Sequence, residues 1–142
     1  MIVLDASVLC ELVTGGENAL EAVRKLAPAD PRNDYEDAFH CPALIEVETL
    51  HALRGMERGG VLTRAEAERA VRDLDDIRMV RHPFGGVVAR RAWALRHNLS
   101  IYDASYVALA ELLDESILLT ADAGLASVTR AALGEARVQL VA

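Results

Sequence analysis

Residues 1–7 of the chain read Met-Ile-Val-Leu-Asp-Ala-Ser. Positions 2–4 form a short apolar run, and Asp5 ends it. An apolar run without polar alternation is typical of a strand that is buried on both faces in a parallel sheet. The segment therefore predicts a buried strand whose C-terminal end presents a carboxylate.

Outward from this strand, helical patterns alternate with short apolar runs. Helices are predicted over 6–13, 17–26, 43–58, 64–76, 87–97 and 102–113, with a further short helix opening at 121–122. Strands are predicted at 39–41, 79–81, 117–119 and 138–141. Such alternation is typical of an α/β fold with a mainly parallel sheet.

Length and composition indicate one folded domain. The 142 residues suffice to bury an ordinary core, and a content of 52% hydrophobic and 26% charged residues excludes a disordered chain. Without internal repeats or a convincing linker, a single domain over residues 1–142 is expected. Residues 27–38 are polar, contain two prolines and are predicted to form a loop.

The sequence favours a cytoplasmic location. No apolar run approaches the roughly 18 residues that a membrane-spanning helix needs. The N-terminus lacks a basic region and places Asp5 where a signal peptide is apolar, which argues against secretion. Cys10 and Cys41 lie in apolar contexts without metal-ligand spacing, so buried free thiols are expected.

The charge balance leaves nucleic-acid binding open. The formal net charge is −7, whereas domains held mainly by phosphate contacts are usually basic. All the cationic residues except Lys25 are arginine, whose planar set of donors suits phosphate. A genome biased in base composition would also favour arginine, so both explanations stand.

Acidic residues follow two of the predicted strands. Asp5 ends the first strand, and Asp122 follows the apolar run at 117–119. Sites in open α/β sheets form beyond the carboxyl ends of strands. Asp103 lies in the first turn of a predicted helix, where capping and the helix dipole offer an alternative role. The alternative role is weaker for Asp5, because its apolar neighbours make desolvation of the carboxylate costly unless a cation or several donors meet it.

The helix after Pro42 carries Glu46 and Glu48. They point about 200° apart around the helix, so at most one faces a common site, and periodicity does not choose between them. Clustered carboxylates repel one another, and a hard divalent cation such as Mg²⁺ resolves that repulsion while holding substrate phosphate. The acids therefore indicate phosphoryl chemistry.

Other sites fit the sequence less well. It has no zinc-ligand spacing and no Gly-x-x-x-x-Gly-Lys-[Ser/Thr] phosphate loop, and a phospho-acceptor domain would need a lysine near a later strand. The histidines expected to be ordinary surface or core residues, without a spaced partner, are His51, His82 and His97. Trp93 and Tyr106 are expected to be packing residues, with a dimer face as an alternative.

Four segments, in order, resemble the PIN domain family. They are residues 1–7; the helix from Pro42 to Arg54, with glutamate six residues after the proline; residues 98–111, which resemble Tyr-Asp-Ala-x-Tyr-Val-Ala-Leu-Ala-Glu; and residues 118–126, which resemble Leu-Thr-x-Asp-x-x-Leu. The match spans nearly the whole chain. Its length and its second and third motifs are most similar to VapC, the ribonuclease toxin of VapBC type II toxin–antitoxin systems.

The resemblance implies a choice that periodicity leaves open. Glu48, not Glu46, matches the family's metal-site glutamate. The implied catalytic and metal-binding quartet is Asp5, Glu48, Asp103 and Asp122, and the implied supporting residues are Ser7 and Thr120. An extra acid found in some relatives near Leu125 is replaced here by apolar residues, so a second metal would be poorly held.

The resemblance also implies the architecture and the activity. The fold would be a three-layer α/β/α sandwich with a short, mainly parallel central sheet. The activity would be that of a Mg²⁺-dependent endoribonuclease, with Mn²⁺ as an alternative ion, which uses metal-activated water to cut structured RNA such as tRNA or rRNA. A VapB-like antitoxin and a homodimer are the implied partners.

Two other functions stay open at this point. One is a non-catalytic PIN-fold interaction module that binds an antitoxin-like partner, and the other is a metal-dependent phosphatase or DNA nuclease. For the ribonuclease, the candidate RNA contacts are Arg78, Arg81, Arg90, Arg91 and Arg96. The alternative for these arginines is a solvated face with ordinary ion pairs.

Overall fold

The computed structural model describes residues 1–26 and 39–142, so the predicted loop at 27–38 lies outside the described residues. The strands are β1 (Ile2–Leu4), β2 (Phe39–Pro42), β3 (Val80–His82), β4 (Ile117–Thr120) and β5 (Val138–Leu140). The helices are α1 (Ala6–Val13), α2 (Glu17–Leu26), α3 (Ile45–Arg58), α4 (Arg64–Asp75), α5 (Gly86–Ala94), α6 (Ile101–Leu112) and α7 (Ala123–Leu133), with a 3₁₀ turn over Glu135–Arg137.

The first strand lies at the centre of the sheet. The five described strands are arranged in the order β3-β2-β1-β4-β5, and every neighbouring pair is parallel. The chain runs outward from β1 to β2 and β3, and then crosses to β4 on the other side of β1. The strand order therefore reverses between β1 and β4, where Leu4 pairs with Leu119.

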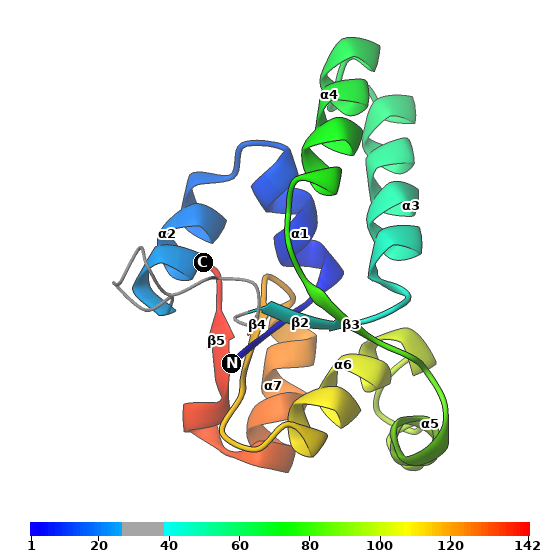
Figure 1. The fold of residues 1–142 in the computed structure, drawn as a ribbon, viewed down its shortest axis with the longest axis vertical. Helices are drawn as coiled ribbons and strands as arrows, with labels where there is room; N and C mark the ends of the chain where they lie inside the picture. The colour runs from blue at the N-terminus through cyan, green and yellow to red at the C-terminus, as the bar shows by residue number, and fades with distance from the viewer. Residues whose placement is uncertain (27–38) are drawn as a thin grey trace.

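Helices cover both faces of this sheet (Figure 1). The helices α1 and α2 lie on one face, and α6 and α7 lie on the other. A hairpin of α3 and α4 extends past the sheet beside α1, while α5 packs against α6. This arrangement is an α/β/α sandwich with a parallel central sheet, which confirms the predicted fold class.

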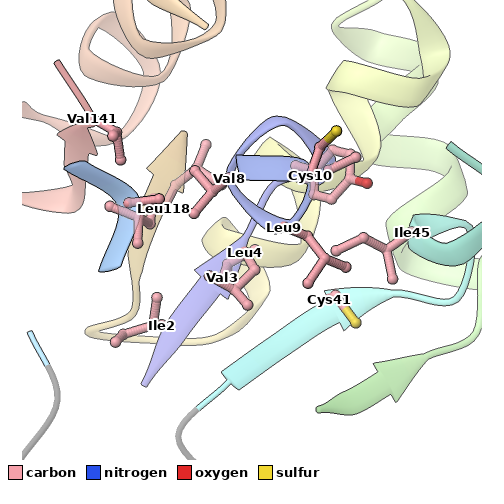
Figure 2. Packing of buried hydrophobic residues seen from close by; sticks show 14 of the residues in the cluster. Ile2, Val3, Leu4, Val8, Leu9, Cys10, Cys41, Ile45, Leu118 and Val141 are labelled. Atoms are coloured by element: carbon pink, nitrogen blue, oxygen red, sulfur yellow. The ribbon is translucent and has the colours of Figure 1, made fainter. Parts of the chain in front are cut away.

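The core fills the space between β1, β4 and the helices. Val3 and Leu4 of β1 and Leu118 of β4 are fully buried, which explains why their sequences are apolar on both faces. Figure 2 shows these side chains in one cluster with Leu9 of α1. Among the described helices, none combines the length and apolarity that crossing a membrane requires.

Both cysteines belong to this core. Cys10 and Cys41 are buried and free, which confirms the sequence prediction. Burial, followed by the nearby Glu46 carboxylate, raises the pKa of the Cys41 thiol to about 12. Burial also raises the pKa of Cys10. Both thiols therefore remain protonated at neutral pH and act as small apolar groups.

Several element boundaries differ from prediction by one to three residues, and two helices show the physical reasons. The third helix begins at Ile45 rather than at residue 43, because Pro42 is the last residue of β2 and the amide of Ala43 donates to His82. The fifth helix ends at Ala94 rather than at residue 97, and the chain turns after it through short-range amide hydrogen bonds.

The N-terminus of α4 is stabilised by a capping box. Thr63 and Glu66 have the spacing of a capping box, and both of its hydrogen bonds form: Thr63 accepts from the Glu66 amide, and the Glu66 carboxylate accepts from the Thr63 amide. These reciprocal bonds satisfy two amide donors that the first helical turn would otherwise leave unpaired.

We expect Leu118→Ala to destabilise the protein by about 2–5 kcal/mol, because it removes a fully buried side chain from the central core. Urea unfolding followed by circular dichroism measures the change. Val61→Ala, at an exposed position after α3, is the control and should change the free energy of unfolding by less than about 0.5 kcal/mol. Equal losses in the two variants would contradict this account of the core.

Candidate active site

Two acids lie at the place where the strand order reverses. Asp5 follows β1 directly, and Asp122 lies two residues after the end of the neighbouring strand β4. Because parallel strands present their carboxyl ends at the same edge, this crevice is the usual location for a site in an open α/β sheet.

Two hydroxyl groups orient the Asp5 carboxylate. One of its oxygens, Oδ2, accepts hydrogen bonds from Ser7 Oγ at 2.6 Å and from Thr120 Oγ1 at 2.7 Å. Each hydroxyl also accepts a backbone hydrogen bond at 3.0 Å, Ser7 from the amide of Ala121 and Thr120 from the amide of Asp122. The hydroxyl protons are therefore directed at Asp5, although the residue is only 4% exposed. Asp5 begins α1 without capping it by its side chain.

Helix α3 directs its two glutamates to different partners. Glu48 Oε1 accepts a hydrogen bond of 2.9 Å from the hydroxyl of Tyr106, a fully buried residue of α6. Glu46 instead forms an ion pair with Arg81. Glu48 therefore lies within electrostatic reach of Asp5, whereas Glu46 is directed towards Arg81.

Asp103 and Asp122 each lie at a helix start, with different local roles. Ser100 caps α6 by accepting from the amide of Asp103 at 3.1 Å, so the cap is the serine and not the acid. Asp122 itself caps α7, since its Oδ1 accepts from the amide of Leu125 at 2.9 Å. The alternative capping role considered from the sequence for Asp103 is thus filled by its neighbour.

The acids share one electrostatic environment. Burial raises the pKa of Glu48, and the charges of Asp5 and Asp103 raise it further against the lowering effect of the Tyr106 hydrogen bond. Burial also raises the pKa of Asp103, as do the charges of Asp5 and Asp122, while hydrogen bonding to Ser100 opposes them. Repulsion therefore links all four carboxylates of the predicted quartet.

The negative charge of this cluster lacks compensation from within the described chain. None of the ion pairs between described residues includes one of the four acids. A cluster that supplies only carboxylate oxygens fits a hard divalent cation. Within the described ranges, however, no three His, Cys, Asp or Glu side chains are already arranged to hold a metal ion. The four acids therefore interact electrostatically, but they do not form a complete set of metal ligands as they stand.

A cavity of about 460 Å³ opens beside two of the acids. It lies between α3 and the start of α6. Its lining consists of Val47, Glu48, His51, Ser100, Tyr102 and Asp103. The acid cluster is therefore continuous with a space large enough for part of a small ligand.

Several predicted RNA-contact arginines already have partners within the chain. Arg81 pairs with Glu46, and Arg91 pairs with Glu111 of α6. Arg96 lies over the ring of Trp93 at 4.5 Å from its centroid. These pairs are exposed enough for a phosphate to compete for the guanidinium groups.

The predictions for Trp93 and His82 need correction. Trp93 is 61% exposed, so it does not pack in the core, and the Arg96 guanidinium lies over its ring. His82 does have a partner, because the parallel pairing of β2 with β3 brings its Nε2 to 2.9 Å from Nδ1 of His40. Burial and the nearby His40 lower the pKa of His82.

The sequence interpretation missed the roles of Tyr106 and Ser100. The spacing of three residues between Asp103 and Tyr106 places both on one face of α6, and this could have linked the tyrosine to the site. Ser100 precedes Asp103 by three residues, which is the spacing of a helix-capping serine and an acid.

Comparisons with known proteins identify the chain's relatives. The family model described as the PIN domain matches residues 2–131. "Ribonuclease VapC3" of Mycobacterium tuberculosis is 36% identical over 126 residues, covering 88% of this chain and 85% of that protein. "Ribonuclease VapC9" of the same species is 36% identical over 132 residues, covering 92% and 93%. "Ribonuclease VapC3" of Pyrobaculum aerophilum is 31% identical over 128 residues, covering 88% and 92%.

We expect Asp103→Asn to stabilise the metal-free protein at pH 7. The folded-state pKa of Asp103 lies above its ordinary value of 3.8, so its ionisation opposes folding. This penalty begins as pH rises past that value and is complete above the folded-state pKa. The gain should therefore be present at pH 7 and disappear as pH falls towards 3.8.

Urea unfolding at both pH values, in the presence of a chelator, measures this difference. Asp114→Asn, in the exposed turn after α6 and outside the acid cluster, is the charge-matched control and should change the free energy of unfolding at pH 7 by less than about 0.5 kcal/mol. A gain for Asp103→Asn that is equal at the two pH values would contradict the repulsion between the acids.

Proposed function

This chain belongs to the PIN domain family, in its VapC group, and from that premise we propose that it is a divalent-metal-dependent endoribonuclease, the toxin of a type II toxin–antitoxin pair. The observation that carries the proposal is the mutually repelling cluster of Asp5, Glu48, Asp103 and Asp122 at the reversal of strand order. Such a cluster opposes folding, and a role in binding a cation gives it a function.

We propose that these four carboxylates hold Mg²⁺, or alternatively Mn²⁺. The all-oxygen donor set and the absence of a compensating ion pair among the described residues support this choice. When bound, such an ion activates water and stabilises the charge that develops on a cleaved phosphodiester.

The chain's own contribution is to hold its carboxylates in fixed orientations. Ser7 and Thr120 fix one oxygen of Asp5, and this leaves the other oxygen available to a ligand. Tyr106 does the same for Glu48 from the buried side of α6. Because these hydroxyls are themselves held by backbone groups or by burial, we propose that they act as positioning residues.

The remaining proposals concern substrate and partners. We propose that a structured RNA such as tRNA or rRNA is the substrate, and that a VapB-like antitoxin binds the protein. A homodimer and a cytoplasmic location are proposed on the same basis, with residues 1–142 acting as one nuclease domain. We propose Trp93, which is exposed on α5, as a candidate contact of that homodimer.

The first experiment is cleavage of total bacterial RNA by the purified protein, with mapping of new 5′ ends. We expect discrete cuts that require Mg²⁺ and disappear with chelator or with Asp5→Asn. Glu48→Gln should lower the cleavage rate by at least about 100-fold, since even partners that only orient metal ligands are worth 10- to 100-fold.

Glu46→Gln is the matched control, because it removes the same charge from the same helix at a residue that pairs with Arg81. It should cleave at close to the wild-type rate. Wild-type cleavage by Asp5→Asn or Glu48→Gln would contradict the assigned site. A folded protein that cuts no RNA but binds an antitoxin-like partner would favour the non-catalytic module.

Phosphate contacts by the arginines can be tested through salt dependence. Arg90→Gln should reduce the slope of log affinity against log salt by about 0.7–0.9, because each phosphate contact releases about that many counterions. RNA affinity at several salt concentrations provides the measurement. Arg64→Gln, whose arginine pairs with Glu68 on α4, is the control and should leave the slope unchanged.

A further inference from the structure

The cavity beside the acids combines groups that the proposed chemistry does not use. Val47, Glu48 and His51 share one face of α3, since they lie three and four residues apart. Tyr102 and Asp103 face them from the first turn of α6. The site therefore has an apolar and aromatic side as well as an acidic side.

The apolar side is open to solvent. Val47 is 66% exposed and Tyr102 is 56% exposed, although both line the same cavity. Leaving such side chains in water forgoes the stabilisation that burial provides. A ligand with a flat, largely apolar surface would cover both.

The charge of the lining limits what can enter. Without a bound cation, Glu48 and Asp103 repel an anionic phosphate within the cavity, because no ion pair among the described residues neutralises them. Their carboxylate oxygens can accept hydrogen bonds from neutral N–H groups. A nucleobase offers both an aromatic face and such donors along its edge.

We propose that this cavity binds one unpaired nucleobase of the RNA, stacked on Tyr102 and met at its edge by His51. The inference rests on the proposed function: Glu48 and Asp103 belong both to the cavity and to the acid cluster proposed to act on the phosphate. The base of a nucleotide attached to that phosphate lies within reach of the cavity.

The consequence is a restriction on the substrate. A base within a helix has both faces stacked and its pairing edge occupied, whereas a base in a loop or bulge can turn out onto an aromatic side chain. The protein should therefore cut RNA next to an unpaired nucleotide. The protein would select the base by the hydrogen-bond donors and acceptors on the base edge, which contact His51 and the two carboxylates.

The test measures binding without cleavage. The probes are eight-nucleotide strands of oligo(A) and oligo(U), and an abasic ribose-phosphate strand of the same length and charge. Their dissociation constants are measured by NMR titration in the presence of a chelator at fixed salt, with the ring signals of Tyr102 and His51 observed directly. Wild-type protein should prefer the strands with bases, and their binding should shift both sets of signals.

Tyr102→Ala should reduce this preference by about 5- to 150-fold, the range that stacking of one base supplies. Tyr102→Phe should retain the preference because it keeps the ring. Phe84→Ala removes an exposed aromatic ring that does not line the cavity and should leave the preference unchanged. Since Tyr102 is exposed, its replacement is not expected to disturb folding.

A preference that is the same in wild type and Tyr102→Ala, or no binding of any strand by wild type, would overturn the inference. The cavity would then suit a cationic side chain of a protein partner instead. The RNA cleavage experiment decides the proposed nuclease separately. Metal-dependent cleavage with an unaltered base preference would remove this inference alone, whereas failure of cleavage would remove the function on which it rests.

Discussion

Two hydroxyl groups, one from the segment after β1 and one from the end of β4, fix the orientation of the Asp5 carboxylate at the centre of the acid cluster. Ser7 and Thr120 belong to segments more than a hundred positions apart, yet both donate to the same oxygen of Asp5. The parallel pairing of β1 with β4 brings them together. Each hydroxyl accepts from a backbone amide, so its proton has one direction in which to point. The buried Asp5 carboxylate is thereby held in one orientation.

Repulsion within the acid cluster reduces the stability of the fold that brings its carboxylates together. Carboxylates that raise one another's pKa values reduce stability at neutral pH, and the buried core around Leu4 and Leu118 must offset that cost. Neutralising the cluster, by an ion or by a partner's cation, would relieve the same repulsion. Ligand binding and folding stability are therefore linked through these side chains.

Sequence patterns predict the helices and strands well, because apolar spacing and end signals involve residues that are close together in the chain. The strand at 2–4, the helices at 6–13 and 17–26 and the capping box at Thr63 follow from apolar spacing and end signals. Periodicity alone leaves Glu46 and Glu48 equivalent, since their difference comes from Tyr106 and Arg81 on other elements. The cavity between α3 and α6 is likewise a product of tertiary packing, with no signal in either segment.

Burial along α6 limits which residues near the site can be substituted. Its residues from Ala104 to Ala110 are all buried, and within that run Tyr106 also holds Glu48. A substitution there alters core packing and site geometry together. The rim formed by Val47, His51 and Tyr102 lies in contact with solvent instead. Divergence in target choice among such proteins is therefore expected at this rim, where side chains can be exchanged without a cost in folding.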